Sequence, residues 1–126
     1  MKQAFIADDA PAPAGPYSHA VRAGDMIYLA GQGPFDPETG KQPETFKEQV
    51  RLTFENLERT ARSAGASLAD AVRIGVYLRD MDDFASMNEV YAERVPEPYP
   101  VRTTIQSDLP GLAVEIDAVL WVGGRD

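Results

Sequence analysis

The arginine in the segment 100–104 is a residue that could hold a small acid. Arg102 stands in a short β-branched run and follows a stretch that contains three prolines. A guanidinium is always charged, and its planar fork binds a carboxylate through two parallel hydrogen bonds. Two interpretations are open from this segment alone: a receptor for an anionic small molecule, or a salt bridge at the surface or at an interface.

Two carboxylates follow in the apolar segment 113–122. If this segment is a strand, its side chains alternate, and Glu115 and Asp117 lie on the face opposite to Val114 and Ile116. We expect the face with the carboxylates to be buried between subunits. Burial raises the pKa of a carboxyl group and makes it usable as a general acid or base. The alternative is that Glu115 or Asp117 is solvated, or pairs with Arg102.

Two further segments could line a pocket. Tyr17 follows a rigid Gly-Pro pair, and its ring can close a small cavity while its hydroxyl stays available for hydrogen bonding. The segment 30–33 has glycines that allow a ligand to approach the backbone, but it lacks the lysine and the helix of a phosphate loop. The single histidine, His19, is interpreted as structural, and 35–40 as a surface turn.

Two helices are predicted to position these groups. Apolar residues at steps of three and four predict a helix over 45–64, which Thr45 and Glu48 begin as a capping box and Gly65 ends. A second helix is predicted over 81–95, before Pro96. Its apolar face is formed by Phe84, Met87, Tyr91 and Val95.

Six strands complete the predicted fold, at 3–6, 18–22, 26–31, 72–78, 101–106 and 113–122. Gly24 and Asp25 fit the turn of a hairpin between the second and third strands. The order β-β-β-α-β-α-β-β predicts an α+β fold with two helices on one face of a mixed sheet.

The second face of this sheet is predicted to be covered by other copies of the chain. Two helices cover one face only, yet 26–30 and 118–122 are apolar on both faces. A sheet face in water would alternate polar and apolar residues. We therefore infer a homo-oligomer whose sheets pack together. The alternative is a buried Val-rich strand in a monomer.

Composition narrows the class of protein. The 126 residues form one expected domain, 1–126, with 44% hydrophobic and 25% charged residues. The net charge of −8 argues against nucleic acid and anionic membranes as partners. The chain has no cysteine, which excludes thiol chemistry, and a single histidine, so no metal is expected. No signal peptide or membrane-spanning run is visible, and we expect a cytoplasmic protein.

Short motifs along nearly the whole chain resemble the YjgF/RidA family of reactive-intermediate deaminases. They are GPYS at 15–18, AGQ at 30–32, DPETG at 36–40, AGASL at 64–68, DMDDF at 80–84, NEVY at 88–91, PVRT at 100–103, LP at 109–110 and VEI at 114–116. The resemblance implies a chorismate-mutase-like fold and a homotrimer with a cleft between each pair of subunits. It also implies hydrolysis of short 2-imino or 2-enamino acids, such as 2-iminobutanoate and 2-iminopropanoate (2-aminoacrylate), to 2-keto acids and ammonia, with no cofactor.

The resemblance also assigns roles to residues. Arg102 is similar to the arginine that holds the substrate carboxylate, and Glu115 to the glutamate near the hydrolytic water. The candidate catalytic residues are Arg102, Glu115 and Tyr17, and the expected substrate-binding residues are Arg102, Tyr17, Ala30, Gly31, Asn88, Tyr91 and Thr104. Many members have Ser where Ala30 stands and Cys where Thr104 stands, which could alter substrate size or rate. Alternatives are a non-catalytic, carboxylate-binding or chaperone-like trimer and, more weakly, a ribonuclease or translation inhibitor.

Overall fold

The longer helix, α1 (Phe46–Ser63), forms where the apolar spacing predicts it. In the computed structural model, which describes residues 1–124, the Thr45 hydroxyl accepts a hydrogen bond from the backbone N–H of Glu48 at 3.3 Å. This cap satisfies a free donor at the start of the helix. The chain turns away at Gly65, whose φ of +78° is the left-handed conformation that glycine adopts without strain. The buried stripe of the helix includes Val50, Phe54, Leu57 and Ala61.

The second helical segment begins with a 3₁₀ turn (Met81–Asp83) and continues as α2 (Phe84–Arg94). Met87, Tyr91 and Val95 are buried, as the sequence predicts. Phe84, predicted on the same apolar face, is 37% exposed. It lies at the start of the helix, where its ring contacts an arginine of the neighbouring strand and not the core.

Six strands form one mixed sheet in the spatial order β1-β2-β3-β6-β4-β5. Only β4 and β5 run parallel; the other neighbours are antiparallel. The chain order β-β-β-α-β-α-β-β is the predicted one. The strands are β1 (Gln3–Phe5), β2 (Ala20–Ala23), β3 (Met26–Gln32), β4 (Ala71–Leu78), β5 (Val101–Gln106) and β6 (Val114–Trp121), and a 3₁₀ turn (Leu68–Asp70) precedes β4.

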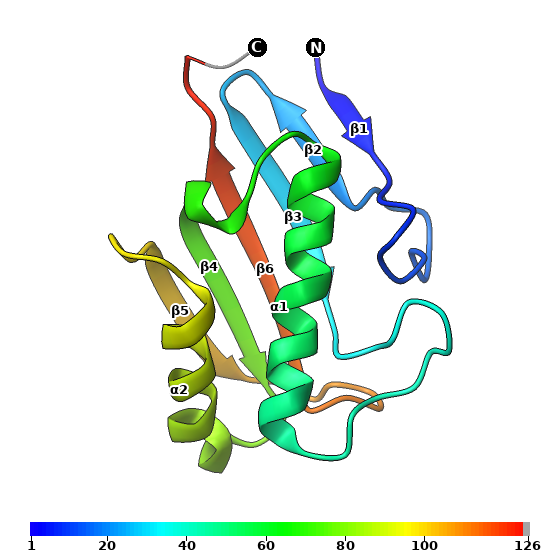
Figure 1. Cartoon of the computed structure of the whole chain (residues 1–126), viewed down its shortest axis with the longest axis vertical. Helices are drawn as coiled ribbons and strands as arrows, with labels where there is room; N and C mark the ends of the chain where they lie inside the picture. Colours follow the sequence, from blue (N-terminus) through cyan, green and yellow to red (C-terminus); the bar gives the residue numbers. More distant parts are fainter. Residues whose placement is uncertain (125–126) are drawn as a thin grey trace.

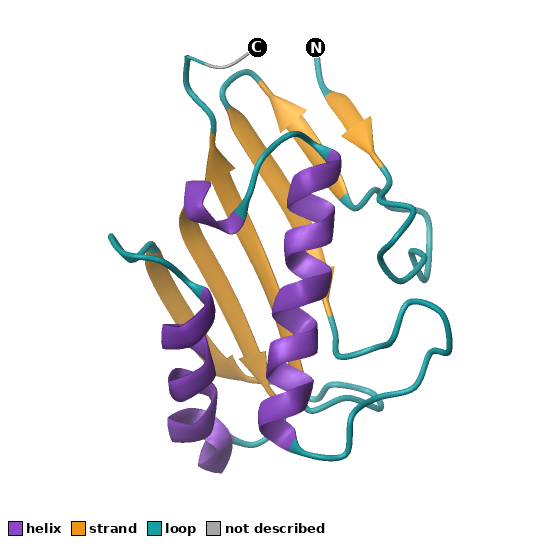
Figure 2. Ribbon diagram, in the orientation of Figure 1, coloured by secondary structure: helices purple, strands orange, loops and turns teal. Residues whose placement is uncertain are grey.

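Both helices cover the same face of the sheet, as Figures 1 and 2 show. The core lies between these two layers. In β6, the side chains of Val114, Ile116, Ala118 and Leu120 face the helices and are buried. The alternate residues of β6 face the other way, and Trp121 at its end is 53% exposed.

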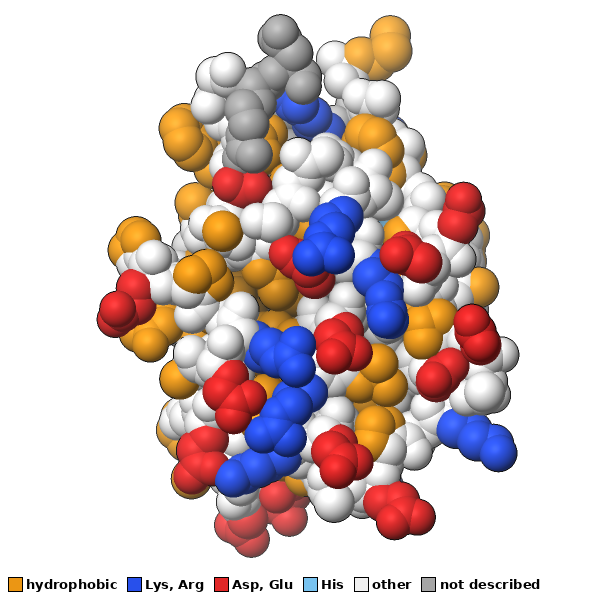
Figure 3. All heavy atoms as spheres, in the orientation of Figure 1, with side chains coloured by type: hydrophobic (Ala, Val, Ile, Leu, Met, Phe, Trp, Pro, Cys, Tyr) orange, Lys and Arg blue, Asp and Glu red, His pale blue; other side chains and the backbone are white. Residues whose placement is uncertain are grey.

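Ion pairs on the outer side of the helix layer join α1 to α2. Arg51 contacts Glu93 at 3.1 Å, and Arg94 lies 3.7 Å from Glu55. Lys47 and Glu89 form a third pair. Figure 3 shows this face with acidic and basic side chains interspersed, which is typical of a solvated helix surface. Within residues 1–124, no helix is both long enough and apolar enough to cross a membrane.

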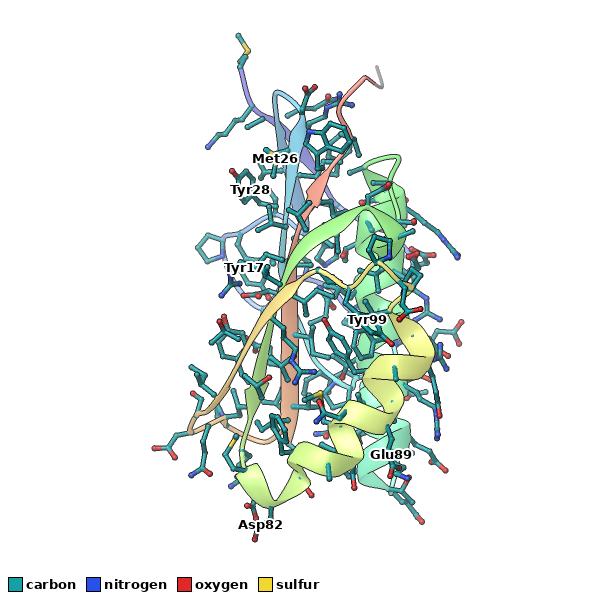
Figure 4. The ribbon with its side chains drawn as sticks, turned by 90° about the vertical axis from the view of Figure 1, so that its left-hand side faces the viewer. Tyr17, Met26, Tyr28, Asp82, Glu89 and Tyr99 are labelled. Carbon is teal, nitrogen blue, oxygen red and sulfur yellow. The ribbon has the colours of Figure 1, made fainter. Side chains whose placement is uncertain are left out.

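The face of the sheet opposite the helices, here called the open face, has no covering layer in the described chain. Figure 4, a side view, shows the helices on one side of the sheet and Met26, Tyr28 and Tyr17 on the other. Tyr28 is 49% exposed on this face, and Ile105 and Val101 of β5 are exposed as well. The predicted excess of apolar residues on the second face is therefore present.

Candidate active site

Arg102 lies on the helix-facing side of β5, at the edge of the sheet. Its cross-strand neighbour is the buried residue Ile74, which fixes the direction of its side chain. The guanidinium carbon lies 4.6 Å from the centre of the Tyr91 ring and 5.6 Å from that of Phe84. Such contacts with aromatic faces hold a cation in place. No carboxylate of residues 1–124 forms an ion pair with Arg102.

Two hydroxyl groups beside this arginine are buried without a hydrogen-bond partner. They are the Tyr91 Oη and the Thr104 Oγ1. Thr104 follows Arg102 by two residues in β5, so both side chains point toward the helices. Burial raises the pKa of Tyr91, and the nearby Arg102 charge opposes part of that shift. The two hydroxyls therefore stay protonated and can act as donors.

Two side chains of the α2 helix, Phe84 and Tyr91, contact Arg102 of β5. Phe84, Asn88 and Tyr91 are spaced by four and three residues and share one face of the helix. The Tyr91 ring also contacts Phe54 of α1, with ring centres 5.8 Å apart. This packing gives the Arg102 side of the site a rigid aromatic support. We call Arg102, Thr104, Asn88, Tyr91 and Phe84 the arginine group.

A cavity lies on the open face, around Glu115. Its volume is about 290 Å³, and its lining includes Tyr17, Gly31 and Glu115. A Cβ on Gly31 would lie 2.7 Å from the Glu115 carboxylate, so only glycine leaves room for that side chain. A bulge in β3 between Leu29 and Gln32 places Ala30 and Gly31 beside β6. We call Tyr17, Ala30, Gly31 and Glu115 the glutamate group.

The environment of Glu115 suits proton transfer. Burial raises the pKa of its carboxyl group, and the adjacent charge of Asp117 raises it further. The alternative that Glu115 or Asp117 pairs with Arg102 does not hold within one chain, because alternation places the β6 carboxylates and Arg102 on opposite faces of the sheet. Asp117 instead accepts a hydrogen bond from Tyr77 at 2.9 Å and lies 3.8 Å from Arg73.

His19 holds the loop that carries Tyr17, and its predicted structural role is confirmed. The imidazole is fully buried; Nδ1 accepts a hydrogen bond from the Ala7 N–H at 2.9 Å, and Nε2 lies 2.8 Å from the Pro11 carbonyl. The Tyr17 hydroxyl accepts from the Ala14 N–H at 3.0 Å. The side chain of Tyr17 is thus tied to its own loop, at the edge of the cavity.

The structure therefore brings the predicted site residues together as two groups, not one. The arginine group lies on the helix side of the sheet, against α2, and the glutamate group, whose Tyr17 is labelled in Figure 4, lies on the open face. Sequence reasoning missed Phe84 as a contact of Arg102, although its spacing of seven residues from Tyr91 places both on one helix face. It also missed Tyr77, whose only signal is its position opposite Glu115. Residues 1–124 contain no cluster of three or more potential metal ligands.

Comparison with known proteins identifies the class to which this fold and these residues belong. The family model described as Endoribonuclease L-PSP matches residues 7–122. The chain belongs to this family, which is the YjgF/RidA family. The resemblance seen in the sequence motifs is confirmed.

Relatives match the chain over almost all of its length. A RutC family protein of Pyrococcus horikoshii is 44% identical over 124 residues, which cover 96% of this chain and 98% of the relative. TdcF of Escherichia coli, provisionally named a reactive intermediate deaminase, is 36% identical over 124 residues, covering 94% and 96%.

Solved structures share the fold. RidA from an Antarctic Psychrobacter species has a TM-score of 0.90 at 43% identity, covering 95% of this chain and 99% of that one. The E. coli TdcF structure with bound serine has a TM-score of 0.87 at 33% identity, covering 98% and 99%. The α+β fold of six strands and two helices is thus the fold of RidA proteins.

Proposed function

We propose that this protein hydrolyses short 2-imino and 2-enamino acids, such as 2-iminobutanoate and 2-iminopropanoate, to 2-keto acids and ammonia. The observation that carries the proposal is Arg102, a partly buried guanidinium that rests on two aromatic rings and forms no ion pair within residues 1–124. A desolvated cation without an anion is a receptor for one. The family and the naming of TdcF supply the reaction class.

A homotrimer with its sites between subunits accounts for the separation of the two groups. In one chain the sheet stands between Arg102 and Glu115. If the open face of one copy packs against the β5 edge of the next, the arginine group of one subunit meets the glutamate group of its neighbour. The same contact covers the exposed apolar residues of the open face. One arrangement thus explains both features.

The chemistry needs little beyond positioning. An imine carbon is already electrophilic, so the protein fixes the substrate carboxylate on Arg102 and holds a water near C2. The water oxygen bonds to C2 while one of its protons passes to Glu115. Starting from the imine protonated at nitrogen, Glu115 then returns this proton to the nitrogen. The C2–N bond breaks to release ammonia as the C2=O bond forms, and the remaining O–H proton passes to solvent. A 2-enamino acid first takes a proton at C3 to become the imine.

The test is a set of imines generated by an amino-acid oxidase, with their rate of loss and ammonia release measured. We expect the protein to accelerate both. Arg102→Lys should reduce kcat/KM by about 100-fold, because lysine keeps the charge but lacks the two-pronged contact. Arg79→Lys, the same change at another position of the chain, is the control. Full activity of Arg102→Lys would remove Arg102 from the mechanism.

Binding of small carboxylates without turnover is the second candidate function. It is favoured by the crystal structure of TdcF with bound serine, since serine is a carboxylate but not an imine. Calorimetry with 2-ketobutyrate separates the two candidates. Binding that requires Arg102, with no acceleration on any imine, would establish the second function and contradict the first. RNA cleavage that persists at constant specific activity through purification would contradict both.

A further inference from the structure

The middle strand β6 carries two carboxylates on the open face, and each lies over a glycine of a flanking strand. Glu115 covers Gly31 of β3, and Asp117 covers Gly75 of β4. A Cβ at either glycine would collide with the carboxylate. The backbone positions are ordinary, because neither glycine has a positive φ. The two glycines therefore make room for two acidic side chains that share one face.

Asp117 is held in this place by Tyr77. The Tyr77 hydroxyl donates to Oδ2 of Asp117 at 2.9 Å. Tyr77 stands directly opposite Glu115 in the β4–β6 ladder, while Asp117 stands opposite Gly75. The Tyr77 phenol thus lies across from Glu115 in the ladder but reaches diagonally to Asp117. The hydrogen bond raises the pKa of Tyr77, as do burial and the negative charge of Asp117, so the phenol keeps its proton and remains a donor.

The remaining oxygen of Asp117 is buried and has no hydrogen bond. Oδ1 has Arg73 as its nearest cation, at 3.8 Å, with the arginine side chain 44% exposed. This long contact leaves much of the Asp117 charge uncompensated. Its field acts on the neighbouring Glu115 through a partly desolvated strip of the sheet, where screening is weak.

The groups around Glu115 come from every neighbouring element. Asp117 lies on its own strand, Tyr77 and Arg73 on β4, Gly31 on β3, and Tyr17 on the loop before β2. No basic side chain of the described chain forms an ion pair with Glu115. Within one chain, Asp117 is therefore the charged neighbour that raises the pKa of Glu115.

We propose that Asp117, held over Gly75 by Tyr77, is a positioning residue that acts through Glu115 to keep a proton available at the site. The inference rests on the proposed function, in which Glu115 takes a proton from water and returns it to the departing nitrogen. Burial and Asp117 both raise the pKa of Glu115, which agrees with this role. Tyr77 and Asp117 do not touch the substrate in this scheme; they act on the residue that does.

The test measures the titration of Glu115 directly, by the ¹³C signal of its side-chain carboxyl, assigned with Glu115→Gln. Asp117→Asn keeps the shape and removes the charge, so we expect the titration midpoint to fall by about 0.5 to 1 pH unit. Tyr77→Phe removes only the hydroxyl that holds Asp117, and the midpoint should fall by less. Asp25→Asn, an exposed residue of the β2–β3 turn, removes the same charge elsewhere and should leave the midpoint unchanged.

The same variants test the consequence for the reaction. The acid limb of the kcat/KM profile reports loss of the carboxylate base, so it should move to lower pH with the Glu115 midpoint in Asp117→Asn. A midpoint that does not move in a folded Asp117→Asn protein overturns this inference, whatever the activity. If the Glu115 midpoint moves in Asp117→Asn but the wild-type protein does not hydrolyse imines, the link between the two carboxylates is supported and the proposed function is overturned.

Discussion

At the scale of single residues, the strongest sign of a ligand is a pair of hydroxyls with nothing to bond. Buried polar groups in folded proteins nearly always have a partner, because leaving one unpaired costs about 1–3 kcal/mol. Tyr91 and Thr104 both violate this rule, and both flank the guanidinium of Arg102. A bound carboxylate would supply acceptors to all three groups. The proposed binding of a carboxylate would therefore give these two unpaired hydroxyls a partner.

Tyr91→Phe separates the effect of this hydroxyl on stability from its effect on ligand affinity. The variant keeps the ring that supports Arg102 and deletes a hydroxyl that contributes no hydrogen bond. We expect the free energy of unfolding to stay within about 1 kcal/mol of wild type, because no partner is lost. The KM for an imino acid, or the Kd for 2-ketobutyrate, should rise about 3- to 10-fold. Denaturant unfolding and calorimetry measure the two effects.

Thr104→Val is the matched test at the second hydroxyl, since it preserves the branched shape. A loss of stability without a change in ligand affinity in both variants would contradict the explanation by binding.

At the scale of elements, the bulge in β3 decides where Glu115 can lie. Ala30 and Gly31 interrupt the β3–β6 ladder, and the carboxylate fills the space that a side chain on Gly31 would take. A bulge inserts one residue and redirects side chains nearby, and bulges often lie next to active sites. The motif AGQ is visible in the sequence, but the contact of its glycine with the Glu115 side chain is not.

Gly31→Ala should displace Glu115 without unfolding the protein. The atoms in the way belong to a flexible side chain, so we expect a stability change below about 1 kcal/mol and a fall in kcat of about 100-fold. In a Glu115→Gln background the added Gly31→Ala change should reduce kcat little further, because both act on the same group. If the two losses of kcat are additive in the double variant, Gly31 does not act through Glu115.

Element type and order could be predicted from the sequence because each rests on local signals. The N-cap at Thr45, the apolar spacing of α1 and the turn at Gly24 all report interactions between near neighbours. The exposure of Phe84 could not be predicted in this way, since helix periodicity cannot tell contact with the core from contact with an arginine on the next strand. The Tyr77–Asp117 pair, 40 residues apart, depends on the β4–β6 register, which only the folded sheet fixes.

At the scale of the whole molecule, the sheet itself separates the two groups of site residues. Its apolar open face and its β5 edge are the surfaces left uncovered by the helices, and each borders one group. The same alternation that buries Ile116 under α1 turns Glu115 away from Arg102. The fold of one chain therefore cannot unite the predicted residues, and a site that uses both must be built from two chains.

Mixing two inactive variants tests this arrangement. Arg102→Ala lacks one half of the site and Glu115→Gln the other, so each should be nearly inactive alone. In a trimer with sites between neighbours, an equal mixture that is unfolded and refolded together pairs an intact Arg102 with an intact Glu115 in about a quarter of the sites. We expect about a quarter of wild-type activity, measured as ammonia release. Mass spectrometry shows whether mixed trimers have formed. If they have formed and no activity is recovered, each site is made within one chain.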